Sequence, residues 1–224
     1  RAMPLSPAFE MVLKEPSAAS DFQCGLTALS RIAPVHLGVG RHQQADALLN
    51  ASDVDINVFD GPCPAGNVGV QVNNIDPVNK GEVVWTVDPA AVIFFGHLFN
   101  TGNVDMTRTI AVAGSEMKQT GYARVKVGAK LCEVLGDNIK TDRHVRLLDG
   151  NPLTGCKTTA DGYLGAHTSE ITAIPEGDDV NEFAGWIMPR LKDFSTSHSY
   201  FSWLFGRNRK YDLDARIKGG ERHM

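Results

Sequence analysis

The 224-residue chain has no long apolar run, no excess of basic charge and no dense cysteine pattern. Its most apolar run, residues 90–99, is far shorter than the roughly 20 residues of a membrane-spanning helix, so we expect a soluble protein. Twenty-six acidic residues outnumber 22 basic ones, and this net charge of -4 argues against nucleic acid as a partner. The first ten residues lack a basic flank before an apolar stretch, so no signal peptide is expected.

The four cysteines, Cys24, Cys63, Cys132 and Cys156, form no C-x-x-C pair. This spacing argues against a zinc or iron–sulfur site and favours reduced, isolated thiols. Cys63 lies between two prolines and is expected to be exposed. Since no basic residue adjoins it, we interpret it as a loop residue rather than a nucleophile. The seven histidines are also dispersed, so no metal site is predicted.

The composition, with 42% hydrophobic and 21% charged residues, excludes the disordered, collagen-like and coiled-coil classes. The length permits one large domain or a medium domain with a small companion, and we expect two units. The phosphate-binding G-x-x-x-x-G-K-[ST], the metalloprotease H-E-x-x-H and the hydrolase G-x-S-x-G are absent. No catalytic residue is therefore predicted.

Through about residue 114, β-rich runs alternate with helical patterns, which predicts an α/β fold with a mostly parallel sheet. Phe22, Leu26 and Leu29 form one apolar stripe on a helix that ends before Pro34. The pattern then predicts a buried strand over 35–39, a helix over 43–50, and strands over 54–59, 83–87 and 109–113. The last of these strands completes a right-handed crossover.

The helix that precedes this last strand has well-defined ends. Asp88 can cap it, Pro89 suits its first turn and Gly102 ends it. Its residues are apolar almost all round, so we expect it to be buried between the sheet and another layer. His97 within this helix, like His36 in its strand, is interpreted as a hydrogen-bonded core histidine rather than a ligand.

From Gly121 the pattern changes and a second unit begins. Residues 122–127 alternate between polar and apolar, which is typical of a strand with one solvated face. A short helix over 131–135 and strands over 144–148 and 170–174 follow, which predicts a small mixed sheet that holds one helix.

Beyond residue 178 the chain is predicted to be irregular. The final residues, 207–224, are polar and are expected to be mobile. Seven aromatic side chains of this region must nevertheless pack on something: Phe183, Trp186, Phe194, Tyr200, Phe201, Trp203 and Phe205.

Gly38, Val39 and Gly40 follow a predicted strand, where a dinucleotide-binding fingerprint would lie. Gln43 replaces the third glycine of G-x-G-x-x-G, so a plain glycine turn is favoured. A second loop, residues 61–66, leaves the carboxyl end of the strand that ends at Phe59, where ligands of open α/β sheets usually bind. Its two prolines fix its shape, and composition alone favours a rigid connection over a binding loop.

The run FDGPCPAGNVGVQVNNIDPVNKGEVVWTVDPAAVIFFGHLFNTG resembles the NqrA family, the A subunits of Na+-translocating NADH:quinone oxidoreductases. Members carry GGPxPAG, I-E/D-P, VWT and GxLFxTG with similar spacing. The segments RTIAVAGSE, VKVGAKLCEVL, DGNPLTG, YLGAHTSEITAIPEGD, EFAGWI and GGERHM then follow in the family's order. The resemblance covers nearly the whole chain from Pro4.

The resemblance implies a Rossmann-like domain over 1–114 and a ubiquitin-like β-grasp domain of the soluble-ligand-binding (SLBB) type over 115–178. An aromatic-rich extension and tail would occupy 179–224. It also implies an internal fragment that lacks the family's N-terminal barrel-like domain and its C-terminal helical part.

The same resemblance implies a peripheral subunit on the cytoplasmic side of the bacterial inner membrane. Its complex oxidises NADH, reduces ubiquinone and exports sodium. Its partners would be the other subunits, especially the integral-membrane B subunit. FAD, FMN, riboflavin and the iron–sulfur centres would reside in those partners, so no redox cofactor is expected in this chain.

The leading hypothesis is a docking subunit that contributes to quinone binding, since a quinone head needs flat apolar walls and one or two hydrogen-bond donors. Four loop residues would shape the contact surface and three helix residues would position the helix behind it: Gly61, Pro62, Pro64 and Gly66, then Gly96, Phe99 and Gly102. Packing explains the glycines and Phe99 equally well.

Two other hypotheses remain open. One is a stand-alone nucleotide- or flavin-binding oxidoreductase that uses the glycine turn at residues 38–40. The other is a relative of the Rnf type, whose comparable subunit carries iron–sulfur cysteine clusters. The spacing of the four cysteines argues against the second of these.

Overall fold

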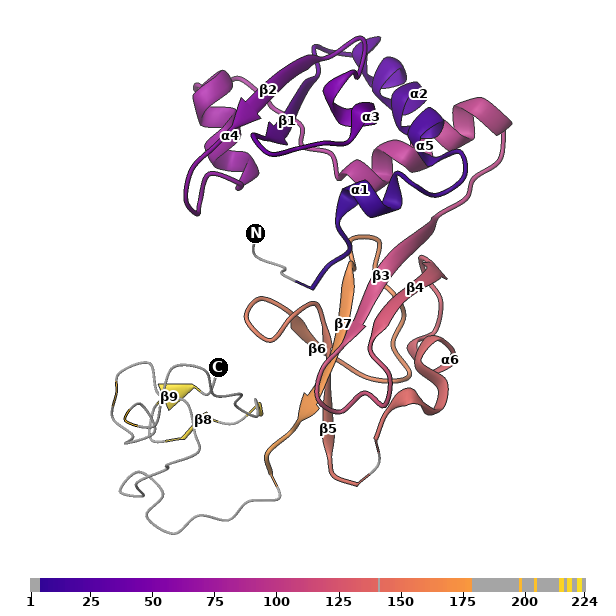
Figure 1. Cartoon of the computed structure of the whole chain (residues 1–224), viewed down its shortest axis with the longest axis vertical. Helices are drawn as coiled ribbons and strands as arrows, with labels where there is room; N and C mark the ends of the chain where they lie inside the picture. Colours follow the sequence, from indigo (N-terminus) through magenta and orange to yellow (C-terminus); the bar gives the residue numbers. More distant parts are fainter. Residues whose placement is uncertain are drawn as a thin grey trace. The chain divides into compact units, whose positions relative to one another are not determined.

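The computed structural model describes residues 5–140 and 142–178, and beyond them residues 198, 204, 214, 215, 217, 218, 221 and 222. The chain divides into two compact units, Arg1–Arg108 (unit 1) and Thr109–Met224 (unit 2). Figure 1 shows both with their helices and strands labelled. The division lies between Arg108 and Thr109, whereas the sequence places its boundary after Gly114. The seven aromatic side chains expected to pack beyond residue 178, and most of the tail, lie outside the described residues.

Unit 1 is built from helices that alternate with two strands. Its elements are α1 (Phe9–Val12), α2 (Ala18–Ser30), β1 (His36–Gly40), α3 (Asp46–Leu49), β2 (Asp55–Phe59), α4 (Val68–Ile75) and α5 (Pro89–Thr101). β1 and β2 pair in parallel, from His36 opposite Asp55 to Gly40 opposite Phe59. The two predicted strands are therefore confirmed to within one residue at each end, as is the helix that ends before Pro34.

The helices of unit 1 cover both faces of this sheet. Val39 of β1 packs in one core with Phe22 of α2, Leu48 of α3 and Val92 of α5. On the opposite face, a Cβ atom at Gly38 would lie 2.5 Å from the side-chain oxygen of Gln71 in α4. α2, α3 and α5 therefore cover one face and α4 the other.

α2 and α5 approach each other so closely that only glycine fits at two positions. A Cβ atom at Gly96 would lie 1.6 Å from the carbonyl oxygen of Asp21, and one at Gly25 would lie 2.1 Å from that of Val92. This backbone contact brings Phe22 and Leu26 into the core, where they are almost fully buried. Gly96 thus has a packing role.

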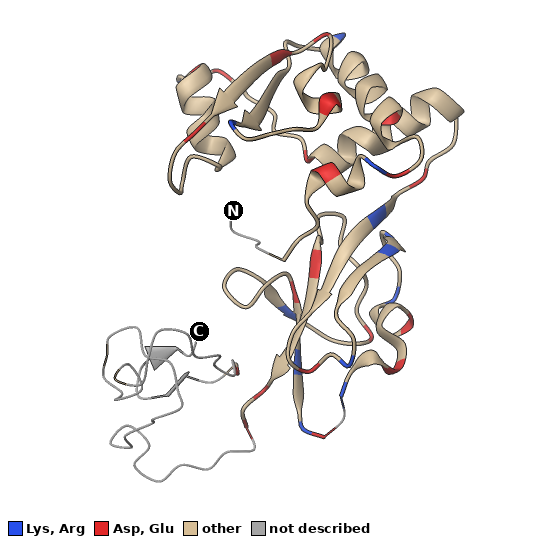
Figure 2. Ribbon diagram, viewed as in Figure 1, with Lys and Arg blue, Asp and Glu red and all other residues tan. Residues whose placement is uncertain are grey.

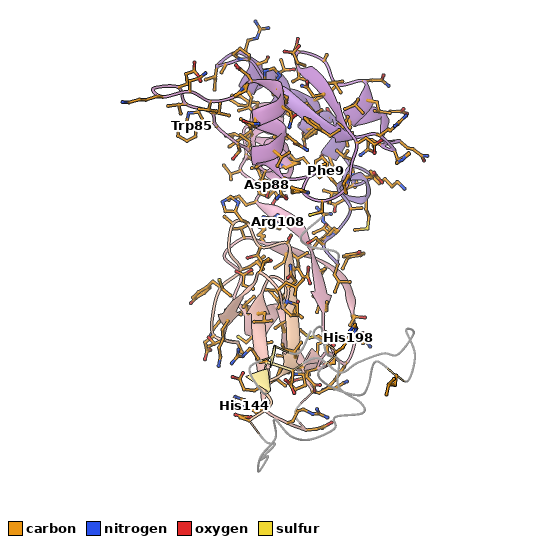
Figure 3. All side chains as sticks on the ribbon, turned by 90° about the vertical axis from the view of Figure 1, so that its left-hand side faces the viewer. Phe9, Trp85, Asp88, Arg108, His144 and His198 are labelled. Carbon is orange, nitrogen blue, oxygen red and sulfur yellow. The ribbon has the colours of Figure 1, made fainter. Side chains whose placement is uncertain are left out.

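Local sequence correctly predicted the ends of α5. Asp88 accepts a hydrogen bond from the Ala90 N–H at 3.0 Å, and Pro89 occupies the first turn. The second carboxylate oxygen of Asp88 pairs with the buried guanidinium of Arg108 at 3.3 Å. Figure 3 labels both side chains. At the other end, Gly102 has a left-handed φ of 76°, which favours glycine.

The expectation that α5 is buried between the sheet and another layer is wrong. Val92 and Gly96 face α2, whereas Phe95, Leu98 and Phe99 are exposed. α5 carries no charged residue, as its uniform tan ribbon in Figure 2 shows. An apolar composition favours burial of a helix. Burial also requires a second layer of structure over the helix, and composition does not show whether one is present. No helix among the described residues is both long and apolar enough to cross a membrane.

The predicted strand over 83–87 is also wrong, and so is the crossover that depended on it. These residues form neither helix nor strand, and Val83, Val84, Trp85 and Val87 are exposed. A strand forms only beside a partner, and β propensity measures fit to a pleated surface rather than the presence of a neighbour. The next strand, β3 (Thr107–Ala113), joins the sheet of unit 2 instead.

Strand β1 differs from the expected buried strand, since Val39 is its one buried residue. His36 is exposed and lies near Asp55 and Asn57, so its interpretation as a core histidine is wrong. Its Nδ1 lies 3.8 Å from a carboxylate oxygen of Asp55, the residue opposite it in β2.

Unit 2 contains a mixed sheet with the strand order β4-β3-β7-β5-β6. β3 and β7 pair in parallel, while β5 is antiparallel to β7 and β6. The other elements are β4 (Gly121–Lys126), α6 (Leu131–Leu135), the 3-10 helix η1 (Gly136–Asn138), β5 (Val145–Asp149), β6 (Cys156–Thr158), β7 (Glu170–Pro175), β8 (Ile217–Lys218) and β9 (Glu221–Arg222).

The core of unit 2 lies between this sheet and α6, where Leu131 packs with Ile110, Leu147 and Ile171. The small mixed sheet that holds one helix is thus confirmed. The sequence analysis did not predict β6.

A charged cluster joins three strands of unit 2. Arg146 of β5 donates two hydrogen bonds to the carboxylate of Glu176, one of them from Nε at 2.8 Å. Lys157 of β6 donates a third from Nζ at 3.3 Å. The Arg146 hydrogen bonds, supported by Lys157, outweigh partial burial and lower the pKa of Glu176 to about 2. Since Glu176 directly follows β7, the cluster holds the ends of β5, β6 and β7 together.

We predict that Gly96→Ala destabilises unit 1 by at least about 1–3 kcal/mol, because its methyl group overlaps the α2 backbone. The matched control is Gly69→Ala, at an exposed position of α4 where a Cβ meets no other atom within 4 Å. That substitution should raise stability by about 0.5–1 kcal/mol. Urea unfolding followed by helical circular dichroism measures both, and equal midpoints for the two variants would contradict the close contact.

We predict that Glu176→Gln destabilises unit 2 by up to about 3 kcal/mol at pH 7. The pKa of Glu176 is about 2 in the folded state and 4.5 ordinarily, so its contribution is complete above pH 4.5 and disappears as the pH falls through 2. The difference between wild type and variant should shrink over that interval, as measured by hydrogen exchange of the β5 and β7 amides. The exposed Glu133, changed to Gln, serves as control.

Candidate binding loop and buried carboxylate of unit 1

The carboxyl ends of β1 and β2 lie at one edge of the sheet, because the two strands are parallel. Arg41 and Asp60 are the first residues after the two strands, and Arg41 Nη1 donates to Asp60 Oδ2 at 2.8 Å. The Arg41 N–H also donates to the carbonyl oxygen of Phe59 at 3.0 Å. The loop at residues 61–66 begins beside this ion pair, so its predicted position at the carboxyl end of the sheet is confirmed.

Two backbone hydrogen bonds shape the loop. The Ala65 N–H donates to the Pro62 carbonyl at 2.9 Å, and the Asn67 N–H donates to the Pro64 carbonyl at 2.8 Å. Every residue from 61 to 66 except Ala65 is exposed, and α4 begins two residues later at Val68. Cys63 is exposed, as expected, and all four cysteines are free. The loop is therefore an exposed turn in which two prolines restrict the backbone conformation.

The seven predicted site residues fall into two groups. Gly61, Pro62, Pro64 and Gly66 lie together in the loop that leads into α4. Gly96, Phe99 and Gly102 lie on α5 or at its end, and α5 packs on the face of the sheet opposite α4. Figure 1 shows the loop and α5 at different sides of unit 1. Phe99 is 67% exposed, so α5 offers an apolar surface of its own.

The glycines at residues 38 and 40 do not form a nucleotide-binding loop. They lie within β1 rather than after it, so the expectation that they follow a strand is wrong. The side chain of Gln71 fills the space above Gly38, and this glycine therefore serves contact between β1 and α4. The short strand simply extends one residue beyond the predicted end.

A buried carboxylate, Asp21 of α2, forms a polar cluster that the sequence analysis missed. Asp21 is 3% exposed. Its Oδ1 accepts a hydrogen bond from Asn100 at 2.7 Å, and its Oδ2 accepts one from Ser17 at 2.9 Å and lies 3.0 Å from His97 Nδ1. His97 is thus hydrogen-bonded, as expected. The sequence does contain one sign of this cluster, namely an acidic residue beside the apolar stripe of α2.

Burial opposes ionisation of Asp21, but hydrogen bonds from Asn100, His97 and Ser17 outweigh it and lower the pKa of this carboxyl below its ordinary value. An ionised carboxylate only accepts hydrogen bonds, so we assign the donating proton to Nδ1 of His97. The cluster links α5 to α2 beside the glycine contact, and it acts as a hydrogen-bonded contact between the two helices.

The chain also has a shallow hollow of about 390 Å³ between the α1 region and the start of α3. Glu10, Lys14 and Asp46 line it, with no aromatic side chain. A hollow with three charged side chains and no aromatic ring lacks the flat apolar walls that a quinone head needs. Among the residues that the structure describes, no group of three or more His, Cys, Asp or Glu side chains is placed to hold a metal ion.

We predict that Asp21→Asn destabilises unit 1 by about 1.5–3 kcal/mol at pH 7, because charge-assisted hydrogen bonds become neutral ones. The pKa of Asp21 is lowered on folding, so its contribution is present above the ordinary value of 3.8 and is lost as the pH falls below it. The variant should therefore lose part of the acid sensitivity of the wild type in urea unfolding. Asp76→Asn, at an exposed position, should retain it in full.

Comparison with known proteins places these features in one family. Residues 1–104 match the family model described as "NqrA second alpha/beta domain", and residues 109–160 match "NQRA C-terminal domain", a model of the SLBB type. The two matches follow each other along the chain and together cover well over half of it.

Several curated proteins are similar over nearly the whole chain, and each is named as the A subunit of Na(+)-translocating NADH-quinone reductase. The protein of Neisseria meningitidis serogroup B is 33% identical over 99% of this chain and 49% of its own length. That of Vibrio anguillarum is 32% identical with the same coverage, and that of Pasteurella multocida is 33% identical over 92% of this chain and 46% of its own. The chain spans about half the length of these relatives.

Proposed function

Since the chain belongs to the NqrA family, we propose that it is part of the A subunit of a Na+-translocating NADH-quinone reductase. The observation that carries this proposal is identity of 31–33% over 99% of the chain to proteins with that name. The reaction of such a complex is oxidation of NADH, reduction of a quinone and transport of sodium. We propose a docking role for this chain within the complex.

The two exposed surfaces of unit 1 support docking. The loop at residues 61–66 presents two prolines on a fixed turn, which contacts a partner with little loss of conformational freedom. The outer face of α5 presents Phe95, Leu98 and Phe99 without any charge on the helix. Exposed aromatic side chains are typical anchors of protein interfaces. We propose that the integral-membrane B subunit is a partner at these surfaces, on the cytoplasmic side of the membrane.

We further propose that the apolar face of α5 contributes to binding of ubiquinone. A quinone head needs flat apolar walls, and Phe99 supplies such a wall at the end of α5. The redox cofactors, namely FAD, FMN, riboflavin and iron–sulfur centres, would belong to partner subunits. The filled space above Gly38 agrees with a chain that binds neither dinucleotide nor flavin there. In fold terms, we propose that unit 1 is a Rossmann-like domain and unit 2 a β-grasp domain.

We predict that Phe99→Glu weakens assembly of the chain with the other subunits at least about tenfold, because a charge then enters an apolar contact. Co-purification at graded concentrations measures the effect. Ile32→Glu is the matched control, since Ile32 is 83% exposed and lies in the same unit just after α2. Equal losses for the two variants would remove α5 from the docking surface.

Quinone titration of the purified chain, followed by equilibrium dialysis, tests the quinone proposal. We expect saturable binding that Phe99→Glu abolishes and Ile32→Glu leaves unchanged. Absence of saturable binding would place the quinone site in other parts of the complex. Yellow colour of the purified chain, or retention of NADH in dialysis, would contradict the proposal that it carries no redox cofactor.

A further inference from the structure

His97 has one ring nitrogen bonded inside unit 1 and the other accessible from outside. Its Nδ1 lies 3.0 Å from a carboxylate oxygen of Asp21, which is almost fully buried, whereas the His97 side chain is 27% exposed. Among the residues that the structure describes, Nε2 makes no hydrogen bond, and it is not one of the buried atoms that lack a partner. Nε2 is therefore a polar atom at the surface of α5, open to a ligand.

The contact with Asp21 determines the chemical character of this free nitrogen. An ionised carboxylate only accepts hydrogen bonds, so the proton of the neutral ring lies on Nδ1. The opposite tautomer would bring the lone pair of Nδ1 against a carboxylate oxygen 3.0 Å away. In the neutral ring Nε2 is thus a hydrogen-bond acceptor, because the bond made by one ring nitrogen sets the state of the other.

The two helices contain no other charged group that competes for the ring. Asp21 is the only charged residue of α2, in which Cys24 is the only other titratable residue, and α5 has no charged residue. Asn100 and Ser17 donate the remaining hydrogen bonds to the Asp21 carboxylate and fix its position. The orientation of the His97 ring is therefore built into the contact between α2 and α5, which lie together in Figure 1.

Apolar side chains of α5 lie next to the free nitrogen. Residues three and four apart on a helix are neighbours, with about 5–6 Å between their Cβ atoms. Phe94, which is half-buried, is thus a neighbour of both His97 and Leu98, and Leu98 is a neighbour of Phe95. The exposed apolar face continues from Phe95 to Phe99. His97 places one hydrogen-bond acceptor at the edge of this face.

A reduced quinone fits this combination better than an oxidised one. Ligand sites combine apolar walls with a few polar groups that fix the orientation of the ligand. The two oxygens of an oxidised quinone only accept hydrogen bonds, whereas the two hydroxyl groups of a quinol also donate them. An acceptor nitrogen therefore bonds to the quinol and repels the lone pairs of the quinone.

We propose that Nε2 of His97 accepts a hydrogen bond from a hydroxyl group of the quinol, and that the α5 face consequently prefers the quinol to the quinone. Asp21 is a positioning residue, because it holds the proton on Nδ1 and the ring in place. The quinol ring packs on Phe94 and Leu98, and its prenyl tail follows the rest of the apolar face. This inference rests on the proposed binding of quinone at α5.

Equilibrium dialysis of the purified chain with a short-chain ubiquinone, oxidised or reduced under argon, tests the preference. At a pH at which NMR shows His97 to be neutral, the quinol should bind at least about tenfold more tightly than the quinone. His97→Phe should remove the preference by weakening quinol binding alone, because the new ring is apolar and lacks the acceptor. His36→Phe, at an exposed histidine of the same unit, should retain the preference.

Nitrogen NMR of the imidazole tests the role of Asp21 without any ligand. In the folded wild type, the proton of the neutral His97 ring should lie on Nδ1. Asp21→Asn presents an amide that can donate to Nδ1, so part of the ring population should carry its proton on Nε2 and the preference for quinol should fall. A neutral wild-type ring with its proton on Nε2 would overturn the proposal.

The dialysis separates failure of this inference from failure of the function on which it rests. Absence of saturable binding of both forms would contradict quinone binding at α5 and the role of His97 together. Saturable binding with equal affinities for the two forms, or a preference that His97→Phe leaves intact, would overturn the role of His97 alone.

Discussion

The contact between α2 and α5 determines the arrangement of the other elements in unit 1. Gly25 and Gly96 allow the two backbones to meet, and the carboxylate of Asp21 forms hydrogen bonds to two side chains of α5 beside that meeting point. Because Phe22 and Val92 come from these helices, the core over the sheet exists only while they stay in register. Steric fit and buried charge thus stabilise the same contact, and the outer face of α5 remains exposed.

Sequence reasoning succeeded where the determining chemistry is local. Asp88, Pro89 and Gly102 mark the ends of α5, and each acts through its own backbone or its nearest neighbours. It failed where the determining contact is distant in sequence. Asp21 accepts a hydrogen bond from Asn100, which lies 79 positions away in the sequence, and nothing in the sequence near either residue identifies that partner. Residues 83–87 have the composition of a strand, yet a strand needs an edge that composition cannot supply.

In the candidate site, too, the sequence predicted some features and missed others. The position of the loop at residues 61–66 follows from parallel strands having their carboxyl ends at one edge, and the sequence predicted it. The pairing of Arg41 with Asp60 follows from the same rule, but it depends on the exact residue at which each strand ends. β1 extends one residue beyond its predicted end, which moved Gly40 from a supposed turn into the sheet. A shift of one residue was enough to change the interpretation of these glycines from a turn to part of a strand.

The two contacts of the Asp88 carboxylate affect how unit 1 opens locally. One oxygen of its carboxylate caps the first turn of α5, and the other binds the buried guanidinium of Arg108. Helix ends ordinarily fray because their terminal groups have few bonds to lose. Here, fraying of the first turn of α5 would also withdraw a charged partner from a buried arginine. The first turn of α5 should therefore open only together with the contact between Asp88 and Arg108.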